Sequence, residues 1–357
     1  MVYDKERYMN EKFDLMLFGP MYYDTKDLRY NNVYKFFLSN QQLIEYKQYK
    51  KQLIQNRDKK IVTVDLKSFN SDYIFFVNGQ CLLNLQLTYL RMMQDDFQNF
   101  QSTVVQRNLY DILWARVYSE LEGSMNLENV PTTRTRLEQI KKGSEPRDKN
   151  EIISKNMLDA IEFILSKPKF NKENLYSLYS ILSHDCLEDQ QQLNGNYYRN
   201  DSVYIGNYEG CPFEKIDDCM NSLFDFVNAN LSEKSYVSES LSHICHYYVL
   251  YIHPYFDYNG RTARMVSLWI SVLQNDFSTA PLFISEAIND DKKRYYDALS
   301  ETRDMENDMT YFLIYIMNTS IRYSLLYKNL NYISDEMLKK GITLTNYEKA
   351  YIKKILL

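Results

Sequence analysis

The sequence predicts a mainly α protein with a mixed α/β region at its N-terminus. From Val104 onward, nearly every stretch has apolar residues at helical spacing. Residues 262–273 carry apolar side chains, including Met265 and Trp269, on almost every side, which is typical of a buried central helix. Short runs rich in β-branched and aromatic residues occur mainly within the first hundred residues. We therefore expect a helical bundle with little sheet.

The first hundred residues combine helical and strand patterns. Residues 43–56 have an amphipathic helical pattern, whereas residues 61–66 and 73–77 are short strand-like runs that predict a small hairpin. Residues 82–97 return to helical spacing. Because the region has no nucleotide or metal motif, a packing or dimerisation lobe is favoured over a chemical role.

The rest of the chain is predicted to be helical, with few interruptions. Apolar periodicity predicts helices over residues 134–142, 151–166, 174–187, 213–231, 238–252, 308–326 and 346–357. We divide the chain into an N-terminal region of unknown role (1–103), a helical domain (104–327) and a C-terminal tail (328–357). The tail resembles the start of a winged-helix module, but no second helix or wing follows.

Composition and charge argue against several classes of protein. A chain of 357 residues with 45% apolar and 25% charged residues can bury a sizeable core. The net charge of −5 argues against a general affinity for nucleic acid or an anionic membrane. No apolar run approaches the length of a membrane span. Five scattered cysteines without a C-x-x-C pair suit a reducing cytoplasm.

Chemically useful side chains concentrate between His253 and Arg264. Histidine can take or give a proton near neutral pH, so His253 is a candidate general base. Asn259-Gly260 is a turn dipeptide. If a helix begins there, successive backbone N–H groups point outward at its start and can bind phosphate.

Two arginines and a carboxylate extend this candidate site. Arg261 and Arg264 are three residues apart, hence on one face of the helix, where two guanidinium groups can bind phosphate oxygens bidentately. Asp257 could hold Mg²⁺, which usually takes one or two carboxylates plus substrate phosphates. These residues predict a site for a nucleoside triphosphate or polyphosphate beside a histidine base.

The same stretch resembles the Fic signature, HPFx[D/E]GNGRxxR, the active-site loop of enzymes that typically move AMP from ATP onto a protein hydroxyl. The matching residues are His253, Pro254, Asp257, Asn259, Gly260, Arg261 and Arg264. Tyr255 stands in place of Phe, and Tyr258 stands in place of the first Gly. Tyr258 places a large ring beside the anion site, disfavours the positive φ that glycine allows, and leaves the preferred nucleotide open. The resemblance spans residues 104–327 and implies a Fic-type helical bundle with a small β-hairpin flap.

A second stretch, Trp114–Gly123, resembles the inhibitory helix motif [S/T]xxxE[G/N] that some Fic proteins carry. Glu122 and Gly123 fit this motif, and Ser119 lies one place after the position of its hydroxyl residue. The resemblance implies that the Glu122 carboxylate pairs with Arg264 and occupies the guanidinium that the γ-phosphate needs. The alternative is a helix that ends at Gly123 with Glu122 in solvent.

Residues 195–206 resemble the target-binding flap of Fic proteins, in which a G-x-x-R element precedes a short strand. Gly195 and Arg199 are one residue further apart than in the family. An edge strand can align an extended peptide from a target through backbone hydrogen bonds. The flap residues named by this resemblance are Val203, Tyr204, Ile205 and Gly206. An ordinary surface hairpin is the alternative.

The segment Arg294–Leu299 resembles the family's Y-Y-x-A-L element, whose aromatic ring tends to lie near the adenine. Tyr295 and Tyr296 are therefore candidate adenine contacts, and packing between helices is the alternative. His246 precedes His253 by seven residues, and we expect it to be a buried, hydrogen-bonded core histidine.

The resemblance implies a protein adenylyltransferase that uses ATP with Mg²⁺, releases pyrophosphate and is inhibited by its own helix. Its partner would be a target protein with an exposed Tyr, Thr or Ser hydroxyl, the chain itself included, and a homodimer is left open. Two alternatives stay open. One is transfer of another nucleotide or of phosphate, or removal of AMP, at the same loop. The other is a non-catalytic protein that only holds nucleotide.

Overall fold

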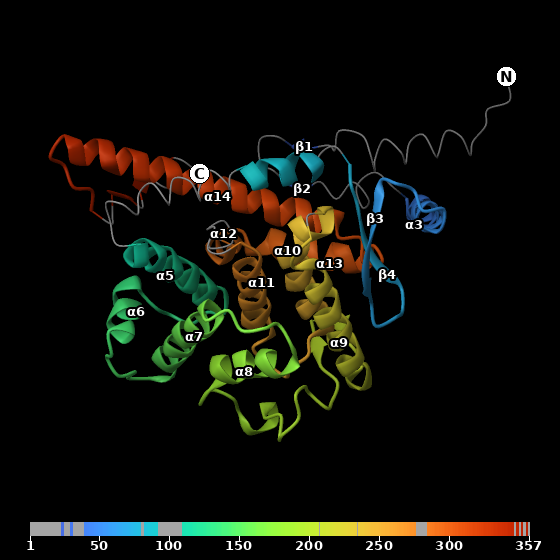
Figure 1. The fold of residues 1–357 in the computed structure, drawn as a ribbon, viewed down its shortest axis with the longest axis horizontal. Helices are drawn as coiled ribbons and strands as arrows, with labels where there is room; N and C mark the ends of the chain where they lie inside the picture. Colours follow the sequence, from blue (N-terminus) through green and yellow to red (C-terminus); the bar gives the residue numbers. More distant parts are fainter. Residues whose placement is uncertain are drawn as a thin grey trace.

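The computed structural model describes residues 23–24, 29–30, 39–79, 82–91, 109–206, 208–233, 235–275 and 284–345, with a few residues beyond. Helices dominate this part of the chain (Figure 1), and its strands form three antiparallel two-stranded sheets. The predicted domain boundary at 103–104 and parts of the predicted helices 82–97 and 346–357 lie outside the described residues.

The N-terminal region contains the predicted helix and hairpin. Helix α3 (Asn40–Gln55) begins with a capping box, in which Ser39 and Gln42 satisfy each other's backbone N–H groups. Strand β3 (Ile61–Lys67) pairs antiparallel with β4 (Tyr73–Val77). The remaining elements here are the short strands β1 (Tyr23–Asp24) and β2 (Arg29–Tyr30) and a helical stretch over residues 82–91.

The helical domain follows the predicted order closely. Its elements are α5 (Leu109–Leu127), α6 (Arg134–Lys141), α7 (Lys149–Leu165), α8 (Lys172–Ser183), the 3-10 helix η1 (Asp189–Gln191), β5 (Tyr204–Ile205), β6 (Tyr208–Glu209), α9 (Phe213–Asn230), α10 (Tyr236–Ile252), α11 (Asn259–Asn275), α12 (Ile284–Asp290), α13 (Lys292–Asp304) and α14 (Thr310–Lys339). Their arrangement is a bundle with α14 along one side and the β3–β4 hairpin at one end (Figure 1).

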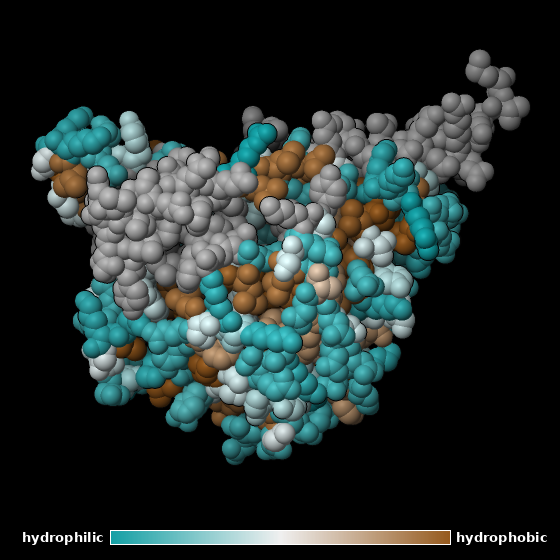
Figure 2. Space-filling view, viewed as in Figure 1, coloured by the Kyte–Doolittle hydropathy of each residue, from teal (hydrophilic) through white to brown (hydrophobic). Residues whose placement is uncertain are grey.

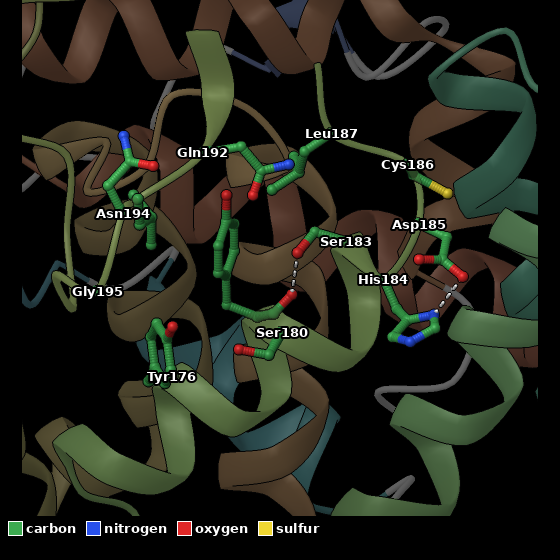
Figure 3. Close-up of a pocket in the computed structure, with 12 residues that line it drawn as sticks. Tyr176, Ser180, Ser183, His184, Asp185, Cys186, Leu187, Gln192, Asn194 and Gly195 are labelled. Atoms are coloured by element: carbon green, nitrogen blue, oxygen red, sulfur yellow. Dashed lines mark hydrogen bonds and ion pairs between the residues drawn. The ribbon is translucent and has the colours of Figure 1, made fainter. Parts of the chain in front are cut away.

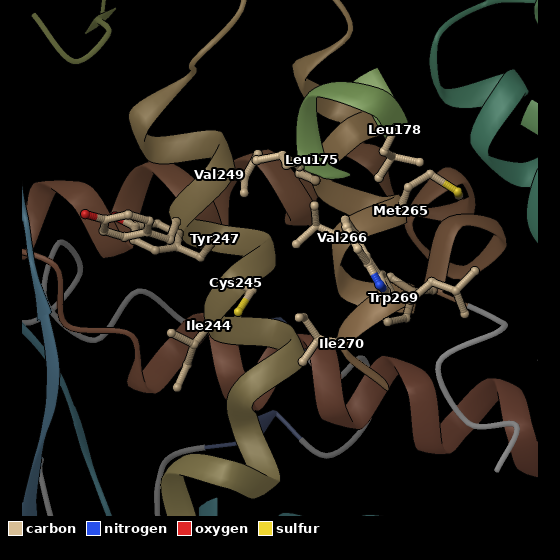
Figure 4. Close-up of a cluster of buried hydrophobic side chains, with 14 of the residues drawn as sticks. Leu175, Leu178, Ile244, Cys245, Tyr247, Val249, Met265, Val266, Trp269 and Ile270 are labelled. Atoms are coloured by element: carbon tan, nitrogen blue, oxygen red, sulfur yellow. The ribbon is translucent and has the colours of Figure 1, made fainter. Parts of the chain in front are cut away.

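Helix α11 lies at the centre of the bundle, as its apolar pattern predicts. It packs along α10 and against α7 and α8. Figure 4 shows Cys245 of α10 and Ile270 of α11 in the layer between these two helices. Trp269 is fully buried, donates from Nε1 to the Pro168 carbonyl at 3.0 Å, and meets the Phe170 ring edge-on at 5.0 Å. This packing fixes α11 within the core around Trp269.

The N-terminal hairpin shares the core of the helical bundle. Val64, Ile74 and Phe76 belong to the same buried cluster as the residues of α10 and α11. A buried ion pair, Lys50 Nζ to Asp308 Oδ2 at 2.7 Å, joins α3 to the start of α14. On the face shown in Figure 2, hydrophilic residues dominate around α8 and α9, and hydrophobic ones gather beside β3 and β4.

The segment 285–302 is divided between α12 and α13, because Asp291 caps a new helix by accepting a hydrogen bond from the Arg294 N–H. The helix predicted to stop at residue 326 continues to Lys339, since no Gly or Pro interrupts the chain before Gly341, whose φ is +78°. Although α14 has 30 residues, the described part contains no helix apolar and long enough to cross a membrane.

Candidate active site

The loop of residues 253–258 connects α10 to α11 and is held in shape by Asn259. The Asn259 Oδ1 accepts from the Tyr255 N–H at 3.0 Å, and its Nδ2 donates to the Tyr255 carbonyl at 2.8 Å. Helix α11 begins at Asn259, and its early N–H groups have no intrahelical acceptor. The buried Asn259 side chain therefore shapes the loop, and the predicted helix start after this loop is present.

His253 lies directly after α10, with a backbone φ of +54° and a partly buried side chain. Its backbone N–H donates to the Val249 carbonyl at 2.9 Å, which completes the last turn of the helix. Burial lowers the pKa of the imidazole to about 4, and the nearby Leu250 carbonyl opposes this shift. The imidazole is therefore neutral near pH 7 and can accept a proton.

Arg199 connects this loop to the segment that carries β5 and β6. Its Nε donates to the His253 carbonyl at 2.8 Å, and its backbone N–H donates to the Pro254 carbonyl at 2.9 Å. The other two guanidinium nitrogens donate to the carbonyls of Asp201 and Cys211. Arg199 is buried, so one side chain satisfies three buried or partly buried acceptors and fixes the base of the hairpin against the loop.

We expect Arg199→Met to lower the free energy of unfolding by about 2 kcal/mol or more, because it leaves carbonyl acceptors unsatisfied inside the protein. Urea unfolding measures this loss. Limited proteolysis of the native protein should also cut faster between residues 201 and 211. Arg134→Met is the matched control: Arg134 pairs with Glu138 on an exposed helix face, so its loss should cost no more than about 0.5 kcal/mol. Equal losses in the two variants would contradict this role.

A carboxylate stands over the first turn of α11. A Cβ atom added to Gly260 would lie 2.7 Å from the Glu128 Oε1, so a side chain at this position would displace the Glu128 carboxylate. The first N–H groups of a helix and the positive end of its dipole favour an anion. Glu128 therefore occupies the space in which the sequence predicts a phosphate.

Arg264 holds that carboxylate. Its Nη2 donates to the Glu128 Oε1 at 2.7 Å, and its Nε donates to the Ser124 Oγ at 2.9 Å. Burial alone would raise the pKa of Glu128, but the charge and hydrogen bond of Arg264 lower it below its ordinary value. Glu128 is therefore ionised near pH 7, and the pair is a charge-assisted bond at a buried guanidinium.

The prediction that Glu122 pairs with Arg264 is therefore wrong. Glu128 lies six residues further along the chain, just after the end of α5, and it makes the contact assigned to Glu122. The hydroxyl that contacts Arg264 is that of Ser124, not that of Ser119. Six residues correspond to one and two-thirds helical turns, so residues 122 and 128 point in different directions.

Gly123 does not end α5, because the helix continues to Leu127. A Cβ atom at Gly123 would lie 2.4 Å from the Glu286 backbone N, so glycine here permits close packing of α5 on α12. Glu120 adds a second contact, since its carboxylate accepts from the backbone N–H and the hydroxyl of Ser285. Burial raises the pKa of Glu120 to about 7. These contacts set the register that brings Glu128 to Arg264.

The two tyrosines predicted near adenine have different environments. Tyr295 is only 2% exposed, and its hydroxyl lies 2.7 Å from the His246 Nε2. A ring enclosed in this way packs between helices, which is the alternative to an adenine contact, and the expectation for His246 is met. Tyr296 is 56% exposed, and the Glu128 charge acts on its hydroxyl. Tyr296 therefore stays a candidate.

Strands β5 and β6 pair as a small hairpin. Tyr204 pairs with Glu209 and Ile205 with Tyr208, and the turn contains Gly206 at a φ of +61°. Gly210 N–H donates to the Val203 carbonyl at 3.0 Å. Tyr204 is 72% exposed, so one face of β5 is open to solvent. The predicted hairpin is present, and its binding role stays a proposal.

Residues 169–271 match the Fic/DOC family. The chain carries a Fic domain. The match includes the loop around His253, the hairpin, and helices α9 to α11, which are the elements described above. The resemblance inferred from the loop motif is thereby confirmed.

Curated relatives of this Fic domain protein are named protein adenylyltransferases. Protein adenylyltransferase fic-1 from Caenorhabditis elegans is 26% identical over 186 residues, which is 49% of this chain and 35% of the relative. Protein adenylyltransferase Fic from Aedes aegypti is 24% identical over 248 residues, which is 65% of this chain and 47% of the relative. The chain thus spans between about a third and a half of the relatives' length.

Solved structures support the fold of the Fic domain. A Fic family protein from Desulfovibrio desulfuricans G20 superposes with a TM-score of 0.55 at 17% identity, covering 75% of this chain and 77% of that one. Fic-1 from C. elegans gives a TM-score of 0.50 at 15% identity, covering 85% of this chain and 81% of that one. The predicted mainly helical Fic-type bundle with a small hairpin is therefore confirmed.

Glu128, which the sequence analysis did not identify, belongs to a recognisable motif. Ser124-Met-Asn-Leu-Glu128-Asn129 fits the inhibitory motif [S/T]xxxE[G/N] at every defined position, whereas the stretch around Glu122 lacks the hydroxyl residue. This match lies six residues further along the chain than the stretch around Glu122. The hydroxyl of Ser124 and the carboxylate of Glu128 in this second match both contact Arg264.

Asp257 suits a Mg²⁺ site that depends on the nucleotide. Its side chain is partly exposed, with Oδ2 accepting from the Gln191 Nε2 at 3.2 Å and Oδ1 from the Tyr258 N–H. The described residues contain no cluster of three or more His, Cys, Asp or Glu side chains that could hold a metal by itself. A single accessible carboxylate fits Mg²⁺ that takes its other ligands from phosphates and water.

A separate hollow of about 590 Å³ lies behind the loop of the Fic domain. Its walls come from α8 and from residues 184–195, and Figure 3 shows Tyr176, Ser180 and Gln192 around it. It contains none of the signature residues, although the Tyr179 ring at its wall stacks on Tyr255 at 3.7 Å. The residues around this hollow include none of those assigned to the candidate active site.

Proposed function

We propose that this protein is a self-inhibited protein adenylyltransferase that moves AMP from ATP to a Tyr, Thr or Ser hydroxyl of a target protein and of itself. The observation that carries the proposal is the Glu128 carboxylate, held by Arg264 over the first turn of α11. An anion is thus already present where a nucleotide phosphate would bind, beside a neutral histidine. The names of the curated relatives support AMP as the transferred group.

In the proposed reaction, the target hydroxyl oxygen attacks the α-phosphorus of ATP, and His253 takes the hydroxyl proton. The bond from the α-phosphorus to the bridging oxygen breaks, and pyrophosphate leaves with the bonding electrons. Arg261, Arg264 and the N–H groups that open α11 hold the phosphate tail. Asp257 would hold Mg²⁺, which would neutralise phosphate charge when bound.

The exposed strand β5 is the proposed docking edge for the target. Tyr204 and Ile205 are open to solvent, and the base of their hairpin is fixed to the His253 carbonyl through Arg199. A target segment paired with this edge would present its hydroxyl near the loop without a strict sequence requirement. Tyr296 is the proposed adenine contact, because it is exposed and lies near Glu128.

Labelling with position-specific ATP tests the function directly. Glu128→Ala protein is incubated with a protein mixture and Mg²⁺, using ATP labelled at the α- or γ-phosphate, or UTP labelled at the α-phosphate. We expect protein-bound label from α-labelled ATP alone. Label from γ-labelled ATP would indicate phosphate transfer, and equal label from UTP would remove the preference for adenine. No label from any of them would leave a protein that only holds nucleotide.

The His253 pKa predicts how the rate depends on pH. A base must be neutral, so activity falls only as the pH drops through its pKa, which burial lowers to about 4. Between pH 7.5 and 5.5 we expect Glu128→Ala protein to lose less than about twofold in kcat/KM through this group. A histidine with an ordinary pKa of about 6.5 would lose roughly tenfold. Initial rates of AMP transfer across this range decide between the two.

Removal of AMP is a second candidate, because the Glu128 side chain is 32% exposed and could orient a water molecule as well as block a phosphate. A target carrying AMP distinguishes the two. Loss of AMP that is faster with wild-type protein than with Glu128→Ala would favour removal. Gain of AMP with Glu128→Ala and no loss with wild type would favour transfer.

A further inference from the structure

Tyr258 has a backbone conformation that tyrosine rarely adopts. Its φ is +66°, in the left-handed region, which is strained for a residue with a Cβ and a ring. The Fic signature has glycine at this position, where the same φ carries no strain. The ring is nevertheless buried, so the protein retains a large side chain at an unfavourable backbone position. This combination requires a compensating contact made by the ring.

That contact is with Arg261. The guanidinium carbon lies 3.6 Å from the centre of the Tyr258 ring, a distance at which the cation stacks on the aromatic face. Burial raises the pKa of the Tyr258 hydroxyl, so the ring is neutral and the attraction is cation–π.

Some N–H donors of the stacked Arg261 guanidinium have no acceptor within the described part of the protein. Arg261 is buried, and its Nε and Nη1 atoms have no hydrogen-bond partner among the described residues. Buried donors without acceptors are rare. They lie on the helix turn that Glu128 covers, and the Glu128 and Arg261 charges act on each other. An anion with several oxygens, such as a polyphosphate, would satisfy them.

We propose that Tyr258 is a positioning residue that holds the Arg261 guanidinium for the polyphosphate tail of the nucleotide. This inference rests on the proposed function, because it assigns a polyphosphate to the same site. With glycine at position 258, the Arg261 side chain could adopt several orientations. Stacking on the Tyr258 ring restricts it to one, in which two donors face the anion. Tyr258 therefore raises affinity for the phosphate tail and leaves affinity for the nucleoside unchanged.

The test measures binding rather than turnover, so its outcome is independent of which group the protein transfers. In the Glu128→Ala background, calorimetry gives the affinities for tripolyphosphate and adenosine with Tyr258→Phe, Tyr258→Leu and Tyr258→Gly. Leu keeps the backbone strain without the ring, and Gly relieves the strain. We expect Leu and Gly to weaken tripolyphosphate binding about tenfold, Phe to stay within about threefold, and adenosine affinity to remain constant.

A double-mutant cycle with Arg261→Met completes the test. If Tyr258 acts through Arg261, the Tyr258→Leu change should weaken tripolyphosphate binding by less than about twofold once Arg261 is methionine. Additive effects would overturn the proposal, as would a Phe variant as weak as Leu, an equal fall in adenosine affinity, or no tripolyphosphate binding by the Glu128→Ala parent. Labelling from ATP reports separately on the proposed function, so the two can fail independently.

Discussion

Replacing Glu128 by alanine is expected to raise AMP transfer between about tenfold and a hundredfold over the wild-type protein. The change removes the carboxylate that accepts from Arg264 at 2.7 Å and clears the space above Gly260. A hydrogen bond to a charged group contributes about 1.5–3 kcal/mol, which corresponds to this range when the bond competes with a phosphate. The measurement is the initial rate of label transfer from α-labelled ATP.

Glu122→Ala is the matched control for this prediction. It removes a different glutamate carboxylate, six residues earlier and within α5, and we expect the rate to stay within about twofold of wild type. Activation by Glu122→Ala with no activation by Glu128→Ala would contradict the inhibitory role proposed for Glu128. Glu128→Ala also leaves the buried Arg264 without its anion, so ATP should raise the melting temperature of this variant more than that of the wild type.

Replacing His253 by alanine in the Glu128→Ala background is expected to lower the rate of AMP transfer by about a hundredfold or more. The variant loses the neutral imidazole that takes the hydroxyl proton, and general base catalysis typically contributes about 10²–10⁴-fold. The phosphate tail does not depend on this side chain, so the loss should appear in kcat. Rates at saturating ATP measure it.

ATP binding distinguishes a missing base from a disrupted loop. The His253 backbone groups bond to Val249 and Arg199 and remain in the alanine variant, so we expect its ATP affinity to stay within about threefold. A rate within about threefold of the parent would exclude His253 as the base. A large fall in ATP affinity together with the rate would instead indicate that the loop itself had changed shape.

The elements predicted well are those whose signals are local. The start of α11 follows from an Asn-Gly turn before a strongly apolar stretch, and the structure places Asn259 at its first position. One predicted limit failed where no residue marks it. Lys339 lies 13 residues beyond the predicted end of the helix at residue 326, because no Gly or Pro occurs between them.

The candidate site divides in the same way. Tyr295 and Tyr296 are adjacent, and the sequence makes each a candidate adenine contact. On a helix, however, their side chains point about 100° apart. Packing against His246 buries the first and leaves the second 56% exposed. Their sequence alone does not contain this difference, because it depends on which face of α13 meets the rest of the bundle.

The sequence by itself determined the chemistry of the loop: the base, the helix start, the carboxylate and the two arginines all lie within twelve residues, so their proximity follows from chain connectivity. Only the tertiary structure decided which carboxylate meets Arg264. Glu128 is 136 positions away from it in the sequence, and their contact depends on the close packing of α5 on α12 at Gly123. Contacts over such distances depend on the relative positions of whole helices, which local patterns do not specify.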